Sequence, residues 1–260
     1  MISKPAVFLF RFGMLLLLIA SITSCKRSVF SLSQVKAEQL KIADSLEADS
    51  RISEFIEPYK KAVDREMDSV LAYAPRTLSK NESPYNTPLG NMMADAVYEM
   101  ANPIFRLRTG KDMDAVLFNH GGIRSDINQG PVTTRTAYEI MPFENILVVA
   151  RLNGTQMQEM VDYLAYGRAH PFTGLRLRLD AEGGTITEAL VNGEPIQPDR
   201  DYWVCTSDYL VNGGDRMTFL TKTEEIHDLN YKVRNALIDY FKKHDTIAPV
   251  RDDRFLAQLP

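Results

Sequence analysis

The chain has 260 residues, of which 45% are hydrophobic and 25% are charged, and this ordinary globular composition excludes a fibrous or wholly disordered protein. Its 34 acidic residues outnumber its 30 basic ones, so the formal net charge of −4 argues against a nucleic acid polymer as partner, because such partners usually require a basic excess. Small anions are compatible with this charge, and the length fits one or two domains.

The first residues have the features of a secretory leader. Lys4 and Arg11 precede a short apolar run over residues 14–20, which is too short to span a bilayer as a stable helix. A buried core helix is the alternative for this run. The residues Ile-Thr-Ser-Cys that end at Cys25 resemble the lipobox of bacterial lipoproteins, in which the cysteine becomes the lipidated first residue.

This resemblance divides the chain into three parts. Residues 1–24 are expected to be a lipoprotein signal peptide, residues 25–48 a tether and residues 49–260 the folded domain. If Cys25 carries lipid, Cys205 has no cysteine partner, since the chain has only two cysteines. Stability must then come from an ordinary hydrophobic core.

The domain begins with residues that predict helices. From Asp49 or Ser50, apolar residues recur every three or four positions as far as Leu71, which predicts a helix with one buried stripe that Pro58 bends or divides. Residues 72–87 are predicted to form a loop. A second helix is expected to follow directly after this loop.

The remainder mixes strands and helices. A helix is expected directly after the second strand, and another closes the chain. The third and fourth strands should form an antiparallel meander through a Gly183-Gly184 turn. Strands are predicted over residues 114–118, 146–152, 175–179, 186–191 and 202–205. The expected fold class is α+β, with a mixed and antiparallel sheet flanked by helices.

Two glycine-rich loops each follow a predicted strand. Residues 119–124 read Asn-His-Gly-Gly-Ile-Arg, and residues 211–215 read Val-Asn-Gly-Gly-Asp. The glycines allow close backbone approach by a ligand, and Arg124 offers a planar fork of donors suited to phosphate or carboxylate. The alternative is a pair of tight turns that carry a surface arginine and an acidic turn former.

Five segments in order resemble one family, the C-terminal domain of the 5′-nucleotidases, which include UDP-sugar hydrolases and cyclic nucleotide phosphodiesterases. The segments fall over about residues 50–220. They are Leu89-Gly90-Asn91 with Ala94-Asp95-Ala96, the loop 119–124, Tyr138-Glu139-Ile140-Met141-Pro142-Phe143, Leu152-Asn153-Gly154, and Asn212-Gly213-Gly214-Asp215. The resemblance implies this family's fold and a nucleotide ligand.

The resemblance also implies substrate-binding roles for particular residues. In the family the arginine of the first loop contacts phosphate or ribose, its asparagine helps to hold the nucleotide, two aromatic residues sandwich the base, and the acid of the second loop holds ribose hydroxyls. The corresponding residues here are Asn119, Gly121, Gly122, Arg124, Phe143, Tyr209 and Asp215. Without the resemblance, composition alone favours Phe143 as a core residue.

The sequence departs from the family at several positions. An ungapped match puts Ser83 where the family has an upstream arginine and Asn86 where it often has an acid. Either phosphate binding is weakened, or Arg76 or Lys80 compensates. His120 replaces a residue that is often small, and it is either a surface bystander or a ligand contact.

The intact enzymes of the family also carry an N-terminal metallophosphoesterase domain with two metal ions and a catalytic histidine. Residues 25–48 are too few to contain that domain, and the four histidines of this chain are scattered. The resemblance therefore implies no catalytic residue, metal or cofactor in this chain, and divalent metal ions in a separate catalytic partner.

These observations lead to one expected function and two alternatives. We expect a nucleotide-binding specificity domain that acts with a separate metallophosphoesterase chain in nucleotide hydrolysis. Its lipid anchor would hold it in the bacterial cell envelope, facing the periplasm. The alternatives are a non-catalytic lipoprotein that scavenges or senses nucleotides, and a structural lipoprotein with a decayed pocket.

Overall fold

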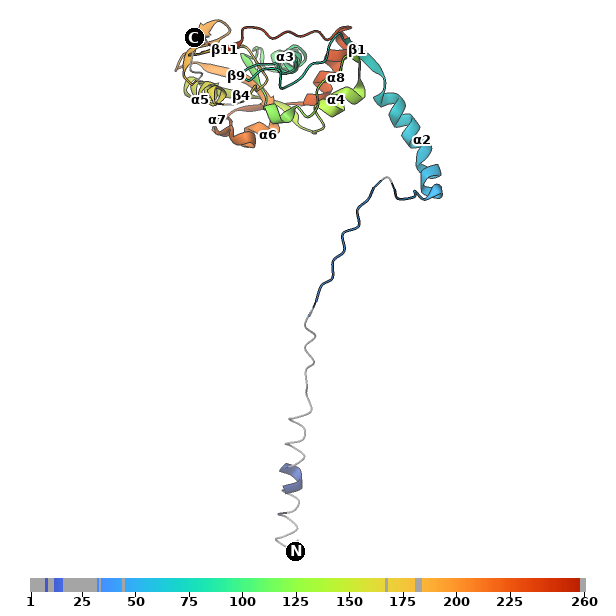
Figure 1. Ribbon diagram of the computed structural model, residues 1–260. Helices are drawn as coiled ribbons and strands as arrows, with labels where there is room; N and C mark the ends of the chain where they lie inside the picture. The colour runs from blue at the N-terminus through green and yellow to red at the C-terminus, as the bar shows by residue number, and fades with distance from the viewer. Residues whose placement is uncertain are drawn as a thin grey trace. The chain divides into compact units, whose positions relative to one another are not determined.

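The computed structural model describes residues 8, 12–15, 32, 34–43, 45–166, 168–180 and 184–257 (Figure 1). Cys25, Gly183 and most of the predicted leader lie outside these residues. The chain divides into two compact units, residues 1–52 and residues 53–260, and the second contains all the sheets and the pocket discussed below. Every helix in the described part of the chain falls short of the length and apolar character that crossing a bilayer requires.

Helix α2 (Ser50–Met67) begins where the sequence predicts it and continues through Pro58 without a division. None of its residues is buried, so the prediction of a buried stripe was wrong. The apolar spacing determines which residues share a face of the helix, but the described part of the chain supplies no cover for that face. The exposed apolar residues are Ile52, Phe55, Ile56, Tyr59 and Val63.

The segment after α2 also differs from the prediction. Leu71 and the start of the predicted loop form strand β1 (Val70–Ala74), which pairs with β3 (Gly130–Thr133) in an antiparallel ribbon. Strand β1 has only five residues and one of its faces is exposed. Its first apolar residues also continue the three- and four-residue spacing of α2, so the sequence pattern does not show where the helix ends and the strand begins. The helix α4 (Thr134–Ile140) follows β3 directly.

The main sheet has five strands, in which only the neighbours β9 and β2 run parallel. Strands β4 and β9 are buried over nearly their whole length, as expected for strands covered on both faces. In spatial order the strands are β10 (Ile226–Lys232), β4 (Ile146–Asn153), β9 (Asp201–Ser207), β2 (Ala115–Leu117) and β5 (Phe172–Thr173).

Helices pack against this sheet from two groups (Figure 1). Helix α3 (Pro88–Thr109) lies beside α8 (Val233–Lys243) and contacts β2 and β5. Helices α5 (Gly154–Ala165) and α6 (Asp208–Val211) contact β4 and β9, and α7 (Thr218–Thr221) contacts both of these helices. The predicted helix after β4 is confirmed, and its start is fixed by a capping box between Asn153 and Gln156.

The predicted meander forms a second, four-stranded sheet. Strands β6 (Leu175–Leu179), β7 (Ile186–Val191) and β8 (Glu194–Pro195) pair antiparallel in chain order. Strand β11 (Phe255–Ala257), which the sequence did not predict, adds to β6 in parallel. The two sheets and their helices confirm the predicted α+β class.

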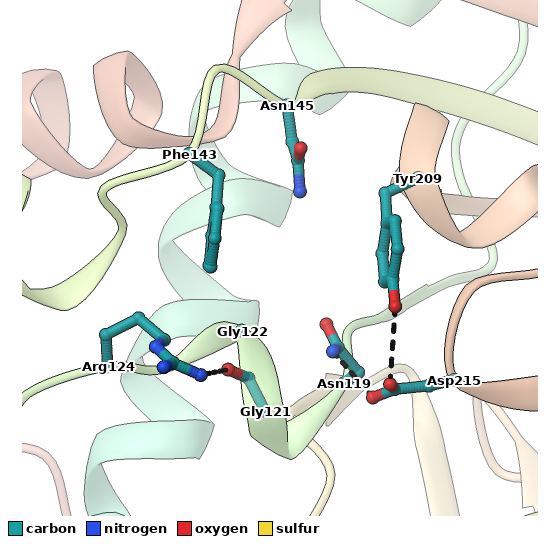
Figure 2. Close-up of a pocket in the computed structure, with 8 residues that line it drawn as sticks. All are labelled: Asn119, Gly121, Gly122, Arg124, Phe143, Asn145, Tyr209 and Asp215. Atoms are coloured by element: carbon teal, nitrogen blue, oxygen red, sulfur yellow. Dashed lines mark hydrogen bonds between the residues drawn. The ribbon is translucent and has the colours of Figure 1, made fainter. Parts of the chain in front are cut away.

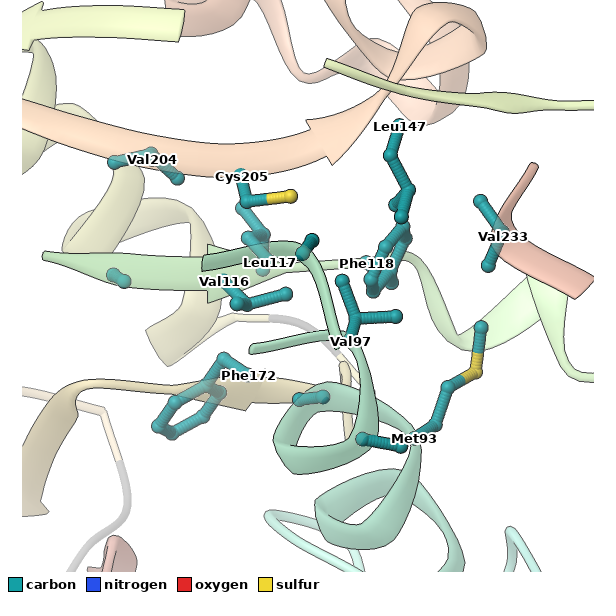
Figure 3. Close-up of a cluster of buried hydrophobic side chains, with 14 of the residues drawn as sticks. Met93, Val97, Val116, Leu117, Phe118, Leu147, Phe172, Val204, Cys205 and Val233 are labelled. Carbon is teal, nitrogen blue, oxygen red and sulfur yellow. The ribbon is translucent and has the colours of Figure 1, made fainter. Parts of the chain in front are cut away.

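The core lies between α3 and the main sheet (Figure 3). Met93 and Val97 of α3 are fully buried against side chains of β2 and the following Phe118. Cys205 of β9 is also fully buried, and this burial raises the pKa of its thiol. The strands that lead into both glycine loops are therefore held in a close-packed layer.

Candidate functional site

Three loops meet at the same end of the central strands of the main sheet because of the directions in which these strands run. The parallel neighbours β2 and β9 both stop at this end of the sheet, where they lead into residues 119–124 and 208–216. Strand β4 is antiparallel to β9 and begins at the same end, since Leu147 pairs with Ser207. Residues 141–145, which precede β4, therefore lie there too. Ligands of open sheets often bind beyond the carboxyl ends of their strands.

A cavity of about 280 Å³ lies between these loops (Figure 2). All seven residues that the sequence selected line it, although they come from three separate parts of the chain. The eighth residue, Asn145, was not predicted from the sequence and lies between the predicted Phe143 and strand β4. The lining residues are Asn119, Gly121, Gly122, Arg124, Phe143, Asn145, Tyr209 and Asp215.

Two aromatic rings form opposite walls of this pocket. Figure 2 shows the rings of Phe143 and Tyr209 on either side of the cavity. Their exposed fractions of 39% and 46% mean that neither is a core residue, so the alternative reading of Phe143 was wrong. A flat ring between them would gain stacking contacts on both faces.

Polar groups occupy the lower end of the pocket in the view of Figure 2. The Asp215 carboxylate accepts hydrogen bonds from Asn119 Nδ2 at 2.6 Å and from the Tyr209 hydroxyl at 3.5 Å. An ionised carboxylate has further lone pairs, which suit a pair of hydroxyl donors. Asp215 has a φ of 50°, a strained conformation that the surrounding turn imposes.

Gly214 sets the position of the Tyr209 wall. A Cβ atom at Gly214 would lie 2.4 Å from the Tyr209 ring, so only glycine lets this ring take its present place. Gly122 is similar, because a Cβ there would lie 2.8 Å from Asn119 Oδ1. The two glycine loops therefore do more than turn the chain, since each gives room to a pocket side chain.

Arg124 stands beside the Phe143 wall. Its guanidinium carbon lies 5.9 Å from the centre of the Phe143 ring, and Nη1 donates a hydrogen bond to the Gly121 carbonyl at 3.3 Å. The side chain is exposed and forms no ion pair among the residues that the structure describes. Most of its donors are thus available to an anion.

A buried arginine forms hydrogen bonds with the backbone of the loop that carries Phe143. Arg234 of α8 is only 3% exposed, and its Nη1 donates to the carbonyls of Phe143 at 3.1 Å and Met141 at 3.4 Å. Its Nη2 pairs with Glu144. Hydrogen bonds from Arg234 and Lys232 lower the pKa of Glu144 to about 2.

The two candidates for a compensating cation have different surroundings. Arg76 pairs with Glu82 at 3.1 Å and does not line the pocket, whereas Lys80 lines a neighbouring cavity and donates to the Ile123 carbonyl. Asn86 is buried and donates to the Asp252 carbonyl, so its role is structural. His120 is only 8% exposed, which rules out a surface bystander.

The described residues do not fit a metal centre. Among them, no group of three or more His, Cys, Asp or Glu side chains is arranged to hold a metal ion. The pocket instead presents amides, a guanidinium, one carboxylate and two rings, which together form a donor set for an organic ligand with an anionic group.

Comparisons with known proteins agree on one family. Residues 69–222 match the model of the 5′-nucleotidase C-terminal domain family. The 5′-nucleotidase of Vibrio vulnificus is 24% identical over 226 residues, which are 82% of this chain and 38% of that protein. The endonuclease YhcR of Bacillus subtilis is 29% identical over 129 residues, which are 48% of this chain and 10% of that protein.

A solved structure extends this similarity to the fold. The 5′-nucleotidase precursor of Thermus thermophilus matches with a TM-score of 0.66 and 25% identity, covering 80% of this chain and 43% of that one. The chain thus spans less than half the length of each of these three proteins.

Proposed function

This chain belongs to the family of 5′-nucleotidase C-terminal domains, and from that premise we propose that its pocket binds a nucleotide as the specificity domain of a phosphoesterase. The observation that carries the proposal is the pair of half-exposed rings, Phe143 and Tyr209, on opposite sides of one cavity. Rings in this arrangement suit a nucleobase and demand little of its identity.

The polar groups match the other parts of a nucleotide. With a base between the rings, ribose hydroxyls would donate to the Asp215 carboxylate, which already accepts from Asn119. The phosphate would lie near Arg124, whose guanidinium can form two parallel hydrogen bonds with it. In this proposal Gly121 and Gly122 let the ligand approach the backbone between these two groups.

Calorimetric titration of the whole chain with AMP and UMP tests binding. We expect both to bind, because stacking tolerates either base, and we expect Arg124→Ala to weaken both about tenfold. Heats equal to those of buffer for both nucleotides would overturn the proposal. Normal binding by Arg124→Ala would show that Arg124 does not hold the phosphate, whereas absence of binding by the unmodified chain would favour a decayed pocket.

We also propose that hydrolysis needs a separate metallophosphoesterase chain. Support comes from the described residues, among which no group of three or more His, Cys, Asp or Glu side chains is arranged to hold a metal ion. Purified chain should therefore not hydrolyse AMP when Mn²⁺ or Co²⁺ is added. Robust metal-dependent hydrolysis would contradict this.

The neighbouring gene separates this proposal from nucleotide scavenging or sensing. A gene for a metallophosphoesterase domain alone, whose product restores AMP hydrolysis to the purified chain, would support the two-chain enzyme. Nucleotide binding with no such restoration would favour the scavenging or sensing lipoprotein.

The cellular location is a further proposal. We infer that Cys25 carries lipid and holds the chain in the bacterial cell envelope, facing the periplasm, because its preceding residues resemble a lipobox. Two proteins tethered to one membrane gain effective concentration. Cys25→Ser should move the chain from the membrane fraction to the soluble fraction and abolish labelling by a fatty acid, and an unchanged distribution would refute the anchor.

A further inference from the structure

The turn over residues 213–216 holds Asp215 in an uncommon backbone conformation. Asp215 and Arg216 have φ angles of 50° and 60°, and Gly213 before them has a φ of 90°. In this left-handed region the Cβ atom of a residue lies too close to the next carbonyl oxygen, so glycine is the usual occupant. Two successive residues that carry side chains therefore need contacts from elsewhere in the fold to keep this shape.

Tyr163 of helix α5 supplies one such contact. Its hydroxyl donates a hydrogen bond to the backbone carbonyl of Asp215 at 2.9 Å. The two residues are 52 positions apart in the chain, so this bond links α5 to the second glycine loop. Burial raises the pKa of Tyr163, and the charge of Asp215 raises it further, so the hydroxyl keeps the proton that it donates.

The ring of Tyr163 packs against two other rings. Its centre lies 5.2 Å from that of His170 and 5.7 Å from that of Phe219, in tilted arrangements. His170 and Phe219 are only 7% and 2% exposed, so both belong to the packed interior. Because close-packed neighbours restrict the ring, its hydroxyl has little freedom to follow a moving turn. The hydroxyl is thus a fixed donor for the carbonyl of Asp215.

The side chain of Asp215 is held by a different segment. Asn119 Nδ2 donates to its carboxylate at 2.6 Å, from the first glycine loop (Figure 2). Helix α5 therefore restrains the backbone of Asp215, while the loop 119–124 restrains its carboxylate. Held at both points, the carboxylate keeps one orientation at the pocket wall, with lone pairs left for hydroxyl donors.

Tyr163 is not among the residues that line the nucleotide pocket, so its effect on a ligand would pass through Asp215. Without the hydroxyl, the turn could relax toward ordinary φ angles, and the carboxylate would move with it. The ribose hydroxyls of a bound nucleotide would then lose their acceptor. The base and the phosphate would keep their contacts, because other residues hold them.

We propose that Tyr163 is a positioning residue for Asp215, and that its hydroxyl gives the pocket a preference for ribose over sugars that lack the 2′ and 3′ hydroxyl groups. This inference rests on the proposed nucleotide pocket, in which Asp215 accepts from the ribose. Tyr163 itself touches neither the base nor the phosphate in this arrangement.

Titration of the whole chain with AMP and with 2′,3′-dideoxy-AMP tests this role. The unmodified chain should bind AMP at least about fivefold more tightly than the dideoxy analogue. Tyr163→Phe keeps the packed ring and removes only the hydroxyl. This variant should weaken AMP binding about fivefold and leave the affinity for 2′,3′-dideoxy-AMP within about twofold of the unmodified chain.

Tyr98→Phe is the matched control. The hydroxyl of Tyr98 on α3 donates to the Met113 carbonyl at 3.3 Å, so this variant also removes a hydrogen bond from a tyrosine to a backbone carbonyl. Tyr98 does not line the pocket, and the variant should keep the preference for AMP. Loss of the preference in both variants would show a general consequence of a less stable fold and would overturn the inference.

A double-mutant cycle tests whether Tyr163 acts through Asp215. Asp215→Ala should abolish the preference for AMP by itself, and adding Tyr163→Phe should weaken AMP binding no further. An additional loss in the double variant would show that Tyr163 acts on another part of the pocket, and it would overturn the assignment.

The same titrations separate this inference from the proposed function. If AMP does not bind the unmodified chain, the nucleotide pocket itself is refuted. The Tyr209 ring packs against Gly214 of the same turn, so a shifted turn could also disturb that wall. In that case Tyr163→Phe would weaken AMP and 2′,3′-dideoxy-AMP equally. This result, or equal affinities of the unmodified chain for the two ligands, would overturn the inference alone.

Discussion

The two aromatic walls of the pocket are held in place by different means. Phe143 lies on a loop whose carbonyl groups bind the buried guanidinium of Arg234. Tyr209 lies on the short helix α6, and its ring rests against the backbone of Gly214. The Phe143 wall therefore depends on a buried charge that also belongs to the core, whereas the Tyr209 wall depends on the absence of one methyl group.

The largest effect on stability is expected from replacing Arg234, which binds the loop that carries Phe143. Arg234→Met should lower the free energy of unfolding by about 3 kcal/mol, because buried carbonyls lose their charged donor. Urea unfolding measures this loss. The control Lys232→Met removes the more exposed partner of Glu144 and should change stability little. Comparable losses in the two variants would mean that burial of Arg234 is not decisive.

Removal of either ring tests whether the walls contribute equally to binding. Phe143→Ala and Tyr209→Ala should each weaken AMP binding by about 1 to 3 kcal/mol, at least fivefold, with little change in unfolding. Tyr209→Phe keeps the ring and loses only a long hydrogen bond to Asp215, so it should stay within about threefold of the unmodified chain. A loss confined to one ring would mean that the base stacks on a single wall.

A methyl group at Gly214 should displace Tyr209 without disturbing the core. Gly214→Ala is expected to weaken AMP binding about tenfold, while thermal unfolding stays nearly unchanged. Gly184→Ala is the matched control, since a Cβ there meets no heavy atom within 4 Å and Gly184 does not line the pocket. Unchanged AMP affinity in Gly214→Ala would show that the ring has room to move.

The ion pairs of Glu144, the residue that follows Phe143, should weaken over a defined range of acidic pH. The pKa of Glu144 is lowered to about 2 from its ordinary 4.5, so its ion pairs stabilise the folded chain above pH 4.5 and this contribution is lost as the pH falls toward 2. The stability difference between the unmodified chain and Glu144→Gln should shrink over that range in urea unfolding. A stability difference that stays constant over this pH range would mean that protonation of Glu144 does not remove its stabilising ion pairs.

The sequence predicts the residues that line the pocket better than it predicts the residues that hold them in place. Asn119, Arg124 and Asp215 belong to motifs with a fixed order, so their meeting could be expected. Arg234 has no such signal, because an arginine on an amphipathic helix usually indicates a solvent-facing side. Arg234 has a role only because it lies beside residues 141–144 in the folded chain. The spacing of residues along the helix does not predict which distant segment an arginine will contact.

The errors in the predicted fold have similar causes. Strands β5 and β11 have two and three residues, too few to show an alternating pattern. The stripe on α2 has the spacing of a buried face, yet periodicity alone does not identify what covers it. Strands with longer patterns, such as β4 and β6, were predicted within a residue or two.

The parallel pair of β2 and β9 also has a consequence for the order of folding. The meander of β6 and β7 joins neighbours in the sequence, whereas Ala115 pairs with Val204 across much of the chain. Contacts between distant segments form slowly, because a long loop must close first. The pocket at the end of this pair thus exists only once nearly the whole domain has assembled. A nucleotide that binds there would recognise the finished chain and protect it, as a whole, from proteolysis.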